Sequence, residues 1–277
     1  MILNPDINSF IIPLLPKVLD LPKWIKIDKT IFPKTNCTSI VIWNNYPTLG
    51  STLGLAKLTN YIRDITYIPT FHLSILIGLL LSDAGLSKQK NSKNARLGFK
   101  QSMIHFPFLW STFMLLSHFC SSIPYHDNAK LKGKFYYGIR MDTRAYSCLT
   151  DLYKLFYIPI TQPDGKISYK KIVPLDIYNL LTPMALAYWI MGDGSGNASK
   201  GLYLCTDSFS NYDIVRLMNV LLIRYNINSS LVQISGKSRI YIASTESAKI
   251  TNLVLEFIHP SMLYKVLGNY PLNKNRI

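Results

Sequence analysis

The sequence predicts an α+β fold of two similar subdomains, preceded by an irregular N-terminal extension. After residue 70, the order helix–strand–helix–hairpin–helix occurs twice in succession. Each copy begins with an apolar helix that ends at an aspartate, Asp83 in the first copy and Asp193 in the second. Two consecutive copies in one chain imply a pseudo-two-fold, as in a homodimer. We therefore expect subdomains at 71–158 and at 182–277, the second including a C-terminal tail, with a linker at 159–181.

The first 70 residues read as an extension rather than as a core domain. Prolines recur through this region and interrupt any long helix. One helix is expected within it, over Leu53–Ile65.

The elements of each copy follow from hydrophobic periodicity and from turns that contain glycine. In the first copy we expect helices at 73–82, 106–119 and 144–156, a strand at 96–102 and a two-strand segment at 130–143. In the second copy we expect helices at 183–192, 212–225 and 247–258, a strand at 201–208 and a hairpin at 230–244.

Composition narrows the class of protein. The chain has 277 residues, a formal net charge of +15, 48% hydrophobic and 12% aromatic side chains, which excludes a disordered basic tail. A surface of this charge attracts polyanions, either nucleic acid or an anionic membrane. The four cysteines include no CxxC pair, so neither a disulfide framework nor a zinc site is expected.

Neither apolar stretch is expected to span a membrane. The run Leu73–Ser82 is too short, because a span needs about 20 apolar residues. The longer run Gln101–His126 lacks charged residues but contains histidines and hydroxyl side chains, and a buried amphipathic helix explains it better. The N-terminus shows no secretory or transit pattern, so a protein working in an organelle would be made there.

The two aspartates predict a cation site. A carboxylate at a helix C-terminus faces the negative end of the helix dipole, so a positive charge must offset it. Small residues, Gly78 in one helix and Ala185 and Ala187 in the other, would let the helices approach closely. Both carboxylates would then meet beside helix-end carbonyls, which together favour Mg²⁺. Alternatively, an aspartate at a helix end is often only a cap.

The segments around these aspartates resemble a known family. LIGLLLSDA (76–84) and LAYWIMGDG (186–194) resemble the duplicated signature of the LAGLIDADG homing endonucleases, and SKNARLGFKQS, LLTPMALAYWIMGDGS and SMLYK extend the similarity over about residues 50 to 270. The chain looks like the single-chain proteins encoded in group I introns of fungal mitochondrial genes.

The resemblance implies an αββαββα fold in each subdomain, with the signature helices at the interface and two saddle-shaped antiparallel sheets on double-stranded DNA. It implies a monomer in the mitochondrial matrix, encoded by the organelle, that cleaves DNA across the minor groove and leaves short 3′ overhangs. Mg²⁺ would be the cofactor; Mn²⁺ would substitute, and Ca²⁺ would bind without supporting cleavage. Asp83 and Asp193 would be the catalytic metal ligands, and the residues next to them, Ala84 and Gly192, would be further metal ligands.

The sequence departs from the signature at several positions. Leu81 and Met191 replace its first aspartate, which is not the essential one, and Ala84 replaces the final glycine. Tyr188 replaces a glycine of the helix, so the helices must pack differently there.

Four further residues are candidates for the catalytic site. By position, Lys171 and Lys237 match the basic residue that members of this family carry near each active centre. The alternative for each is an ordinary lysine on the surface. Gln101 and Asp207 occupy equivalent places in the two copies, where each could hold a metal ion or a water molecule near the phosphate. The alternative for each is a polar residue at the end of a strand with no catalytic role.

The basic residues of the expected sheets are candidates for DNA binding. Because most are lysines, we expect phosphate contacts more than base reading. They are Lys88, Lys90, Lys93, Arg96, Lys100, Lys130, Lys132, Lys134, Arg140, Lys200, Lys237 and Arg239.

Together these features predict a site-specific, metal-dependent double-strand DNA endonuclease for intron homing. The alternative is a maturase that binds group I intron RNA and assists its splicing. A basic protein of a membrane surface is a weaker third possibility.

Overall fold

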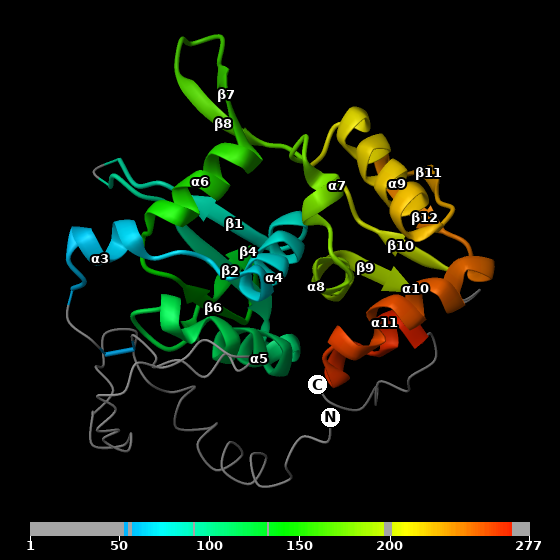
Figure 1. The fold of residues 1–277 in the computed structure, drawn as a ribbon, viewed down its shortest axis with the longest axis horizontal. Helices are drawn as coiled ribbons and strands as arrows, with labels where there is room; N and C mark the ends of the chain where they lie inside the picture. Colours follow the sequence, from blue (N-terminus) through cyan, green and yellow to red (C-terminus); the bar gives the residue numbers. More distant parts are fainter. Residues whose placement is uncertain (1–52, 55–56, 91, 132, 197–200, 268–277) are drawn as a thin grey trace, which may run out of the picture. The chain divides into compact units, whose positions relative to one another are not determined.

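The computed structural model describes residues 53–54, 57–90, 92–131, 133–196 and 201–267 (Figure 1). Most of the predicted extension, residues 1–52 and 55–56, therefore lies outside the described residues. The chain divides into two compact units. The described part of the first unit consists of residues 53–58 and 100–144, and that of the second consists of residues 59–99 and 145–267, except for the short gaps given above.

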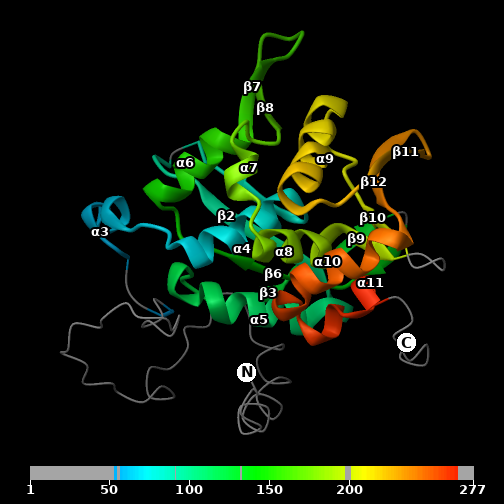
Figure 2. The ribbon, with the colours of Figure 1, turned by 45° about the vertical axis from the view of Figure 1, so that its right-hand side comes forward.

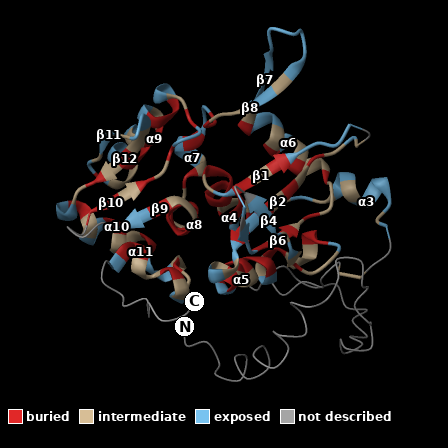
Figure 3. Ribbon diagram, turned by 180° about the vertical axis from the view of Figure 1, so that it is seen from behind, coloured by how far each residue is buried: buried red, intermediate tan, exposed pale blue. Residues whose placement is uncertain are grey.

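The core of the second unit is a pair of packed helices, α4 (Thr70–Leu81) and α8 (Pro183–Asp193). Both are apolar on all sides, and their later turns are buried (Figure 3). The start of α8 is specified locally, because Pro183 occupies the first turn and the Thr182 hydroxyl accepts a hydrogen bond from the Ala185 amide. A helix that is apolar all round must be buried on all sides. Each of these two packs against the other, and α4 also packs on the strand that follows it while α8 also packs on the C-terminal helices.

A short antiparallel pair follows α4. Strand β1 (Ala84–Ser87) pairs with the first part of β2 (Arg96–Ser102), with Ala84 opposite Phe99 and Ser87 opposite Arg96. Helix α6 (Ser147–Phe156) is amphipathic and buries Leu149, Leu152 and Phe156. The short helix α3 (Asn60–Ile65) precedes α4.

A hairpin stands where the sequence predicts only a linker. Strands β7 (Tyr157–Thr161) and β8 (Ile167–Lys171) pair antiparallel, with Tyr157 opposite Lys171, and the hairpin extends beyond the end of α6 (Figures 1 and 2). Its turn uses Gly165 at φ +76°, a conformation that glycine adopts without steric cost. The prolines of this segment suggested a loop, but Pro159 is tolerated because a two-stranded sheet consists of edge strands.

The rest of the second unit is a four-stranded antiparallel sheet covered by helices. The strand order is β11 (Ser230–Ile234), β12 (Lys237–Ile242), β10 (Leu202–Leu204) and β9 (Gly194–Gly196). Helix α9 (Asn211–Tyr225) packs on β11 and β12. The remaining helices are α7 (Ile177–Leu180), α10 (Ser247–Val254) and α11 (Tyr264–Leu267).

The first unit contains helix α5 (Phe106–Leu116) and strands β3 (Tyr125–His126) and β6 (Gly138–Asp142), which pair antiparallel. Between them, β4 (Ala129–Leu131) and β5 (Lys134–Tyr136) form a small hairpin. Phe108, Leu109, Phe113 and Leu116 of α5 are buried.

Most predicted elements are present, with informative differences. The helix predicted over Leu53–Ile65 forms only as α3, and α5 ends at Leu116, where a 3₁₀ turn continues to Phe119. Strands β1 and β9 were not predicted. Each is only three or four residues long, which is too short to show periodicity, and each is defined by its pairing with a partner strand. Within the described residues, no helix is long and apolar enough to cross a membrane.

Candidate active site

The packing of α4 against α8 depends on a close approach at Gly78. A methyl group on Gly78 would lie 2.3 Å from the Ala185 carbonyl oxygen and 2.5 Å from the Tyr188 Cβ. This confirms the predicted role of Gly78 and Ala185 in bringing the helices together. The tyrosine that replaces a glycine of the signature is accommodated because its counterpart, Gly78, has no side chain.

The close approach brings Asp83 beside the end of α8. A methyl group on Gly192 would lie 2.4 Å from the Ser82 Oγ and 3.2 Å from the Asp83 Oδ2, so this carboxylate lies against the residue before Asp193. Asp83 is exposed and Asp193 is partly buried. The two predicted carboxylates are therefore neighbours at an edge that solvent can reach.

Each aspartate has a lysine at its helix end. Lys171 Nζ donates to the Ala84 carbonyl at 2.9 Å and to the Ser82 carbonyl at 3.4 Å. Lys265 Nζ donates to the carbonyls of Met191 and Gly192, both at 2.6 Å. These ammonium groups supply the positive charge that a carboxylate at a helix C-terminus requires.

Lys265 was not singled out from the sequence. It lies in the short helix α11 and is buried, although lysine is almost never fully buried without a partner. The sequence signal that could have found it is a lysine in an apolar setting, MLYKVL, whereas its contact with the end of α8 is visible only in the structure. The reasoning from the helix dipole required such a charge but did not locate it.

The four charges perturb one another. Burial, and next the charge of Asp83, raise the pKa of Asp193 to about 7. Burial lowers the pKa of Lys171 to about 8, against the opposing attraction of Asp193 and Asp83. Burial also lowers the pKa of Lys265, which both aspartates oppose. Because the charge of Asp83 disfavours the charged form of Asp193, a cation bound between them would stabilise this site.

The donor set fits a hard divalent cation. Carboxylate oxygens of Asp83 and Asp193 are the ligands that Mg²⁺ prefers, and substrate oxygens and water complete such sites. The carbonyls of Ala84 and Gly192, which were also predicted as ligands, each accept a hydrogen bond from a lysine ammonium. Among the described residues, no group of three or more His, Cys, Asp or Glu side chains is placed to hold a metal ion.

Asp207 and Lys237 form a second charged group with Arg239. The Arg239 guanidinium binds both Asp207 carboxylate oxygens, at 2.9 and 3.1 Å, and Lys237 Nζ lies 2.9 Å from Oδ2. The hydrogen bond from Arg239, followed by that from Lys237, lowers the pKa of Asp207 to about 2. The charge of Asp207 contributes to the raised pKa of Asp193, so the two groups are electrostatically coupled.

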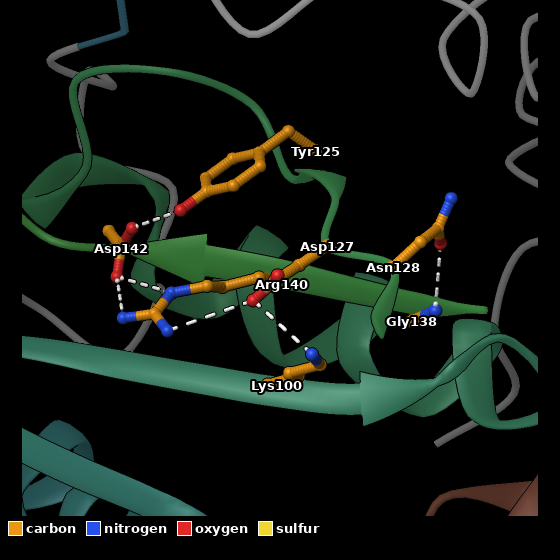
Figure 4. Close-up of polar contacts among 7 residues, drawn as sticks. All are labelled: Lys100, Tyr125, Asp127, Asn128, Gly138, Arg140 and Asp142. Atoms are coloured by element: carbon orange, nitrogen blue, oxygen red, sulfur yellow. Dashed lines mark hydrogen bonds and ion pairs between the residues drawn. The ribbon is translucent and has the colours of Figure 1, made fainter. Parts of the chain in front are cut away.

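The other predicted residues are distributed over both units. Gln101 is buried in the first unit, as part of β2. Lys88, Lys90 and Lys93 are exposed in the second unit, between β1 and β2. In the first unit, Lys100 and Arg140 are engaged by Asp127 (Figure 4). Lys132 and Lys200 lie outside the described residues, as does the side chain of Lys134.

Comparison with known proteins places this geometry in a family. Residues 73–250 match the LAGLIDADG DNA endonuclease family. The chain is 33% identical over 205 residues to the cytochrome b mRNA maturase bI2 of Saccharomyces cerevisiae, covering 72% of this chain and 47% of that protein. It is also 33% identical over 204 residues to the maturase bI2 of Debaryomyces hansenii, covering 72% and 74%. The chain thus spans about half the length of the first of these relatives.

A solved structure confirms the fold. The homing endonuclease I-WcaI bound to its DNA recognition sequence superposes with a TM-score of 0.65 at 27% identity, covering 74% of this chain and 89% of that one. The predicted α+β class and the resemblance of the two signature helices are therefore confirmed. The family match spans well over half of the residues, and the chain belongs to the LAGLIDADG DNA endonuclease family.

Proposed function

We propose that this protein is a site-specific DNA endonuclease that cuts both strands of its target across the minor groove, leaving short 3′ overhangs. The observation that supports this most strongly is the pair Asp83 and Asp193 at two packed helix ends, with Lys171 and Lys265 beside them. The duplicated architecture within one chain favours a monomer that straddles a roughly two-fold duplex. The similarity to cytochrome b mRNA maturases favours an organelle-encoded protein of the mitochondrial matrix.

The side chains have distinct roles in this proposal. Asp83 and Asp193 would hold Mg²⁺, which would supply positive charge to the phosphate and to the attacking water. Lys171 and Lys265 keep further positive charge at the helix ends, where phosphate oxygens develop negative charge. In the reaction, the attacking water loses one proton as its oxygen bonds to phosphorus, one P–O ester bond breaks, and the departing oxygen gains a proton, so that one water molecule is consumed for each strand cut.

The test is cleavage of DNA that carries the joined exons without the intron. The protein with Mg²⁺ should cut this DNA once, whereas Asp83→Asn and Asp193→Asn should lose cleavage while retaining binding in a gel-shift assay. Lys265→Met should reduce the single-turnover rate by about 10²-fold or more, as loss of a charge that stabilises the transition state does. Asp151→Asn, an exposed carboxylate on α6, is the matched control and should cut normally.

If the DNA stays intact at several low salt concentrations, with either Mg²⁺ or Mn²⁺ present, the proposed endonuclease activity is excluded. Full activity of both aspartate variants would exclude the proposed site even if cleavage occurs.

A second candidate function is supported by the relatives. Both yeast proteins at 33% identity are mRNA maturases, so we propose assistance to splicing of the intron RNA as the alternative role. Splicing of that RNA in vitro should accelerate when the protein is added, and Asp193→Asn should accelerate it equally, because this role needs no cleavage. Unchanged splicing rates would exclude it.

A further inference from the structure

The β4–β5 hairpin of the first unit presents aromatic rings to solvent. Phe135, Tyr136 and Tyr137 are 63%, 53% and 64% exposed, and Ile104 nearby is 80% exposed. The Met103 amide donates to the Tyr137 carbonyl, which places the segment with Ile104 against this hairpin. Other rings of the protein are also exposed singly, but here three consecutive aromatic residues are exposed together, and contiguous apolar surfaces commonly bind a partner.

The hairpin carries positive charge and no uncompensated negative charge. Lys130 is directly opposite Phe135 in the register, and its Nζ lies 5.2 Å from the centre of the Phe135 ring. The neighbouring carboxylate, Asp127, is engaged by Lys100 at 3.4 Å and by Arg140 at 3.8 Å (Figure 4). A basic surface with exposed rings suits nucleic acid, since phosphates meet the cation and bases stack on the rings.

The base of the hairpin is held firmly. Asn128 Oδ1 accepts from the Gly138 amide at 3.1 Å, and the Asp127 amide donates to the Gly138 carbonyl at 2.9 Å (Figure 4). Gly138 is required there, because a methyl group would lie 2.8 Å from the Asp127 carbonyl oxygen. A surface fixed in this way loses little entropy when a ligand binds.

The chemistry of these side chains favours unpaired bases over a duplex. In duplex DNA the bases are already stacked, and groove readout uses mainly Arg, Lys, Asn and Gln. Aromatic rings gain most where bases are splayed out, as in the loops and bulges of structured RNA.

We propose that the β4–β5 hairpin is a stacking platform for unpaired RNA bases, separate in function from the Asp83–Asp193 site. This inference rests on the second candidate function, the binding of intron RNA.

The test compares one variant on three nucleic acids. The triple variant Phe135→Ala/Tyr136→Ala/Tyr137→Ala should bind an oligouridylate of about 16 nucleotides roughly 10- to 100-fold more weakly than the unaltered protein. Its affinity for the duplex DNA target should change less than about twofold, within the effect expected for side chains that do not touch the duplex. An oligothymidylate of equal length should bind less tightly than the RNA, because it lacks the 2′-hydroxyls.

Two controls separate stacking from other effects. Tyr212→Ala removes an 86% exposed ring from α9 and should leave oligouridylate affinity unchanged. Phe135→Leu/Tyr137→Leu keeps apolar bulk but removes two π-faces, and should lose most of the affinity that the alanine variant loses. Circular dichroism and melting temperature should match the unaltered protein in every case.

Each result that would contradict the stacking platform has a different meaning. Equal losses on duplex DNA and RNA would assign the hairpin to the DNA interface, and retained affinity in the leucine variant would exclude stacking. Equal affinity for oligothymidylate and oligouridylate would exclude a preference for RNA. A protein that does not accelerate splicing yet binds oligouridylate through these rings would lose the maturase role but keep the platform.

Discussion

At the scale of single residues, the active site places charges where folding disfavours them. Asp193 is the last residue of a helix that is otherwise apolar. Its side chain is partly buried and lies next to a second carboxylate, that of Asp83. Its pKa is raised to about 7, first by burial and then by Asp83. The two lysines offset the repulsion but are themselves desolvated. Without a cation, this group of charges should therefore reduce stability.

Asp193→Asn should accordingly raise the melting temperature of the metal-free protein. A carboxyl group with a folded pKa of about 7, against 3.8 when unfolded, binds its proton more tightly in the folded state. The folded protein therefore loses stability as the pH rises from about 4 to 7, and the variant escapes this loss. In EDTA the variant should melt a few degrees higher at pH 8 and show little difference at pH 4.

Asp151→Asn, at an exposed site, should leave both melting temperatures unchanged. A lower melting temperature for Asp193→Asn at pH 8 in EDTA would contradict this account.

At the scale of elements, the position of each aspartate depends on how closely α4 and α8 pack. The contact at Gly78 allows no extra atom, since the Ala185 carbonyl lies 2.3 Å from where its Cβ would be. Backbone atoms of a buried helix cannot move aside without separating the helices. Packing and catalysis are thus linked at this contact.

Gly78→Ala should destabilise the protein by about 3 kcal/mol or more, at the upper end of overpacking effects, and should abolish cleavage in any folded fraction. Gly85→Ala is the matched control, because its Cβ would meet only the Tyr157 hydroxyl at an ordinary 3.5 Å. Urea denaturation and cleavage assays measure both effects. Normal stability of the Gly78 variant would show that the helices separate without cost.

The elements that sequence reasoning found and missed differ physically. Helices α4 and α8 were recognisable because a long apolar run ending in one charge is a strong local pattern. Strands β1 and β9 were not, because three or four residues carry too little periodicity and their pairing depends on distant partners. Lys265 was missed for the same reason: its contact with Gly192 is made across the fold.

At the scale of the whole molecule, a net charge of +15 should govern affinity for nucleic acid. Lysines that contact phosphates release counterions, so binding should weaken steeply with salt. Several of the predicted contacts are partly neutralised, since Asp127 engages Lys100 and Arg140 and Asp207 engages Lys237 and Arg239. The exposed Lys88, Lys90 and Lys93 lie in the segment between β1 and β2, and Lys93 pairs with Asp64 at 3.4 Å.

Affinity for the DNA target should therefore fall by roughly 10³-fold or more between ~50 and ~200 mM salt. Lys88→Ala and Lys90→Ala should each reduce the slope of log affinity against log salt by about one, equally for target and unrelated sequences. Lys154→Ala, whose lysine pairs with Asp151 on α6, is the control and should leave the slope unchanged. Filter binding over a salt series measures this, and a slope near zero would contradict an electrostatic grip.

The pairing of Gly78 with Tyr188 has a consequence for the ancestry of the chain. In the duplicated signature these two residues occupy the same position, and each packs against its own counterpart. A homodimer of the first half would place two glycines at this contact, whereas a homodimer of the second half would place two tyrosines there. The two halves are therefore no longer interchangeable at this position, and the second half alone would have to pack differently.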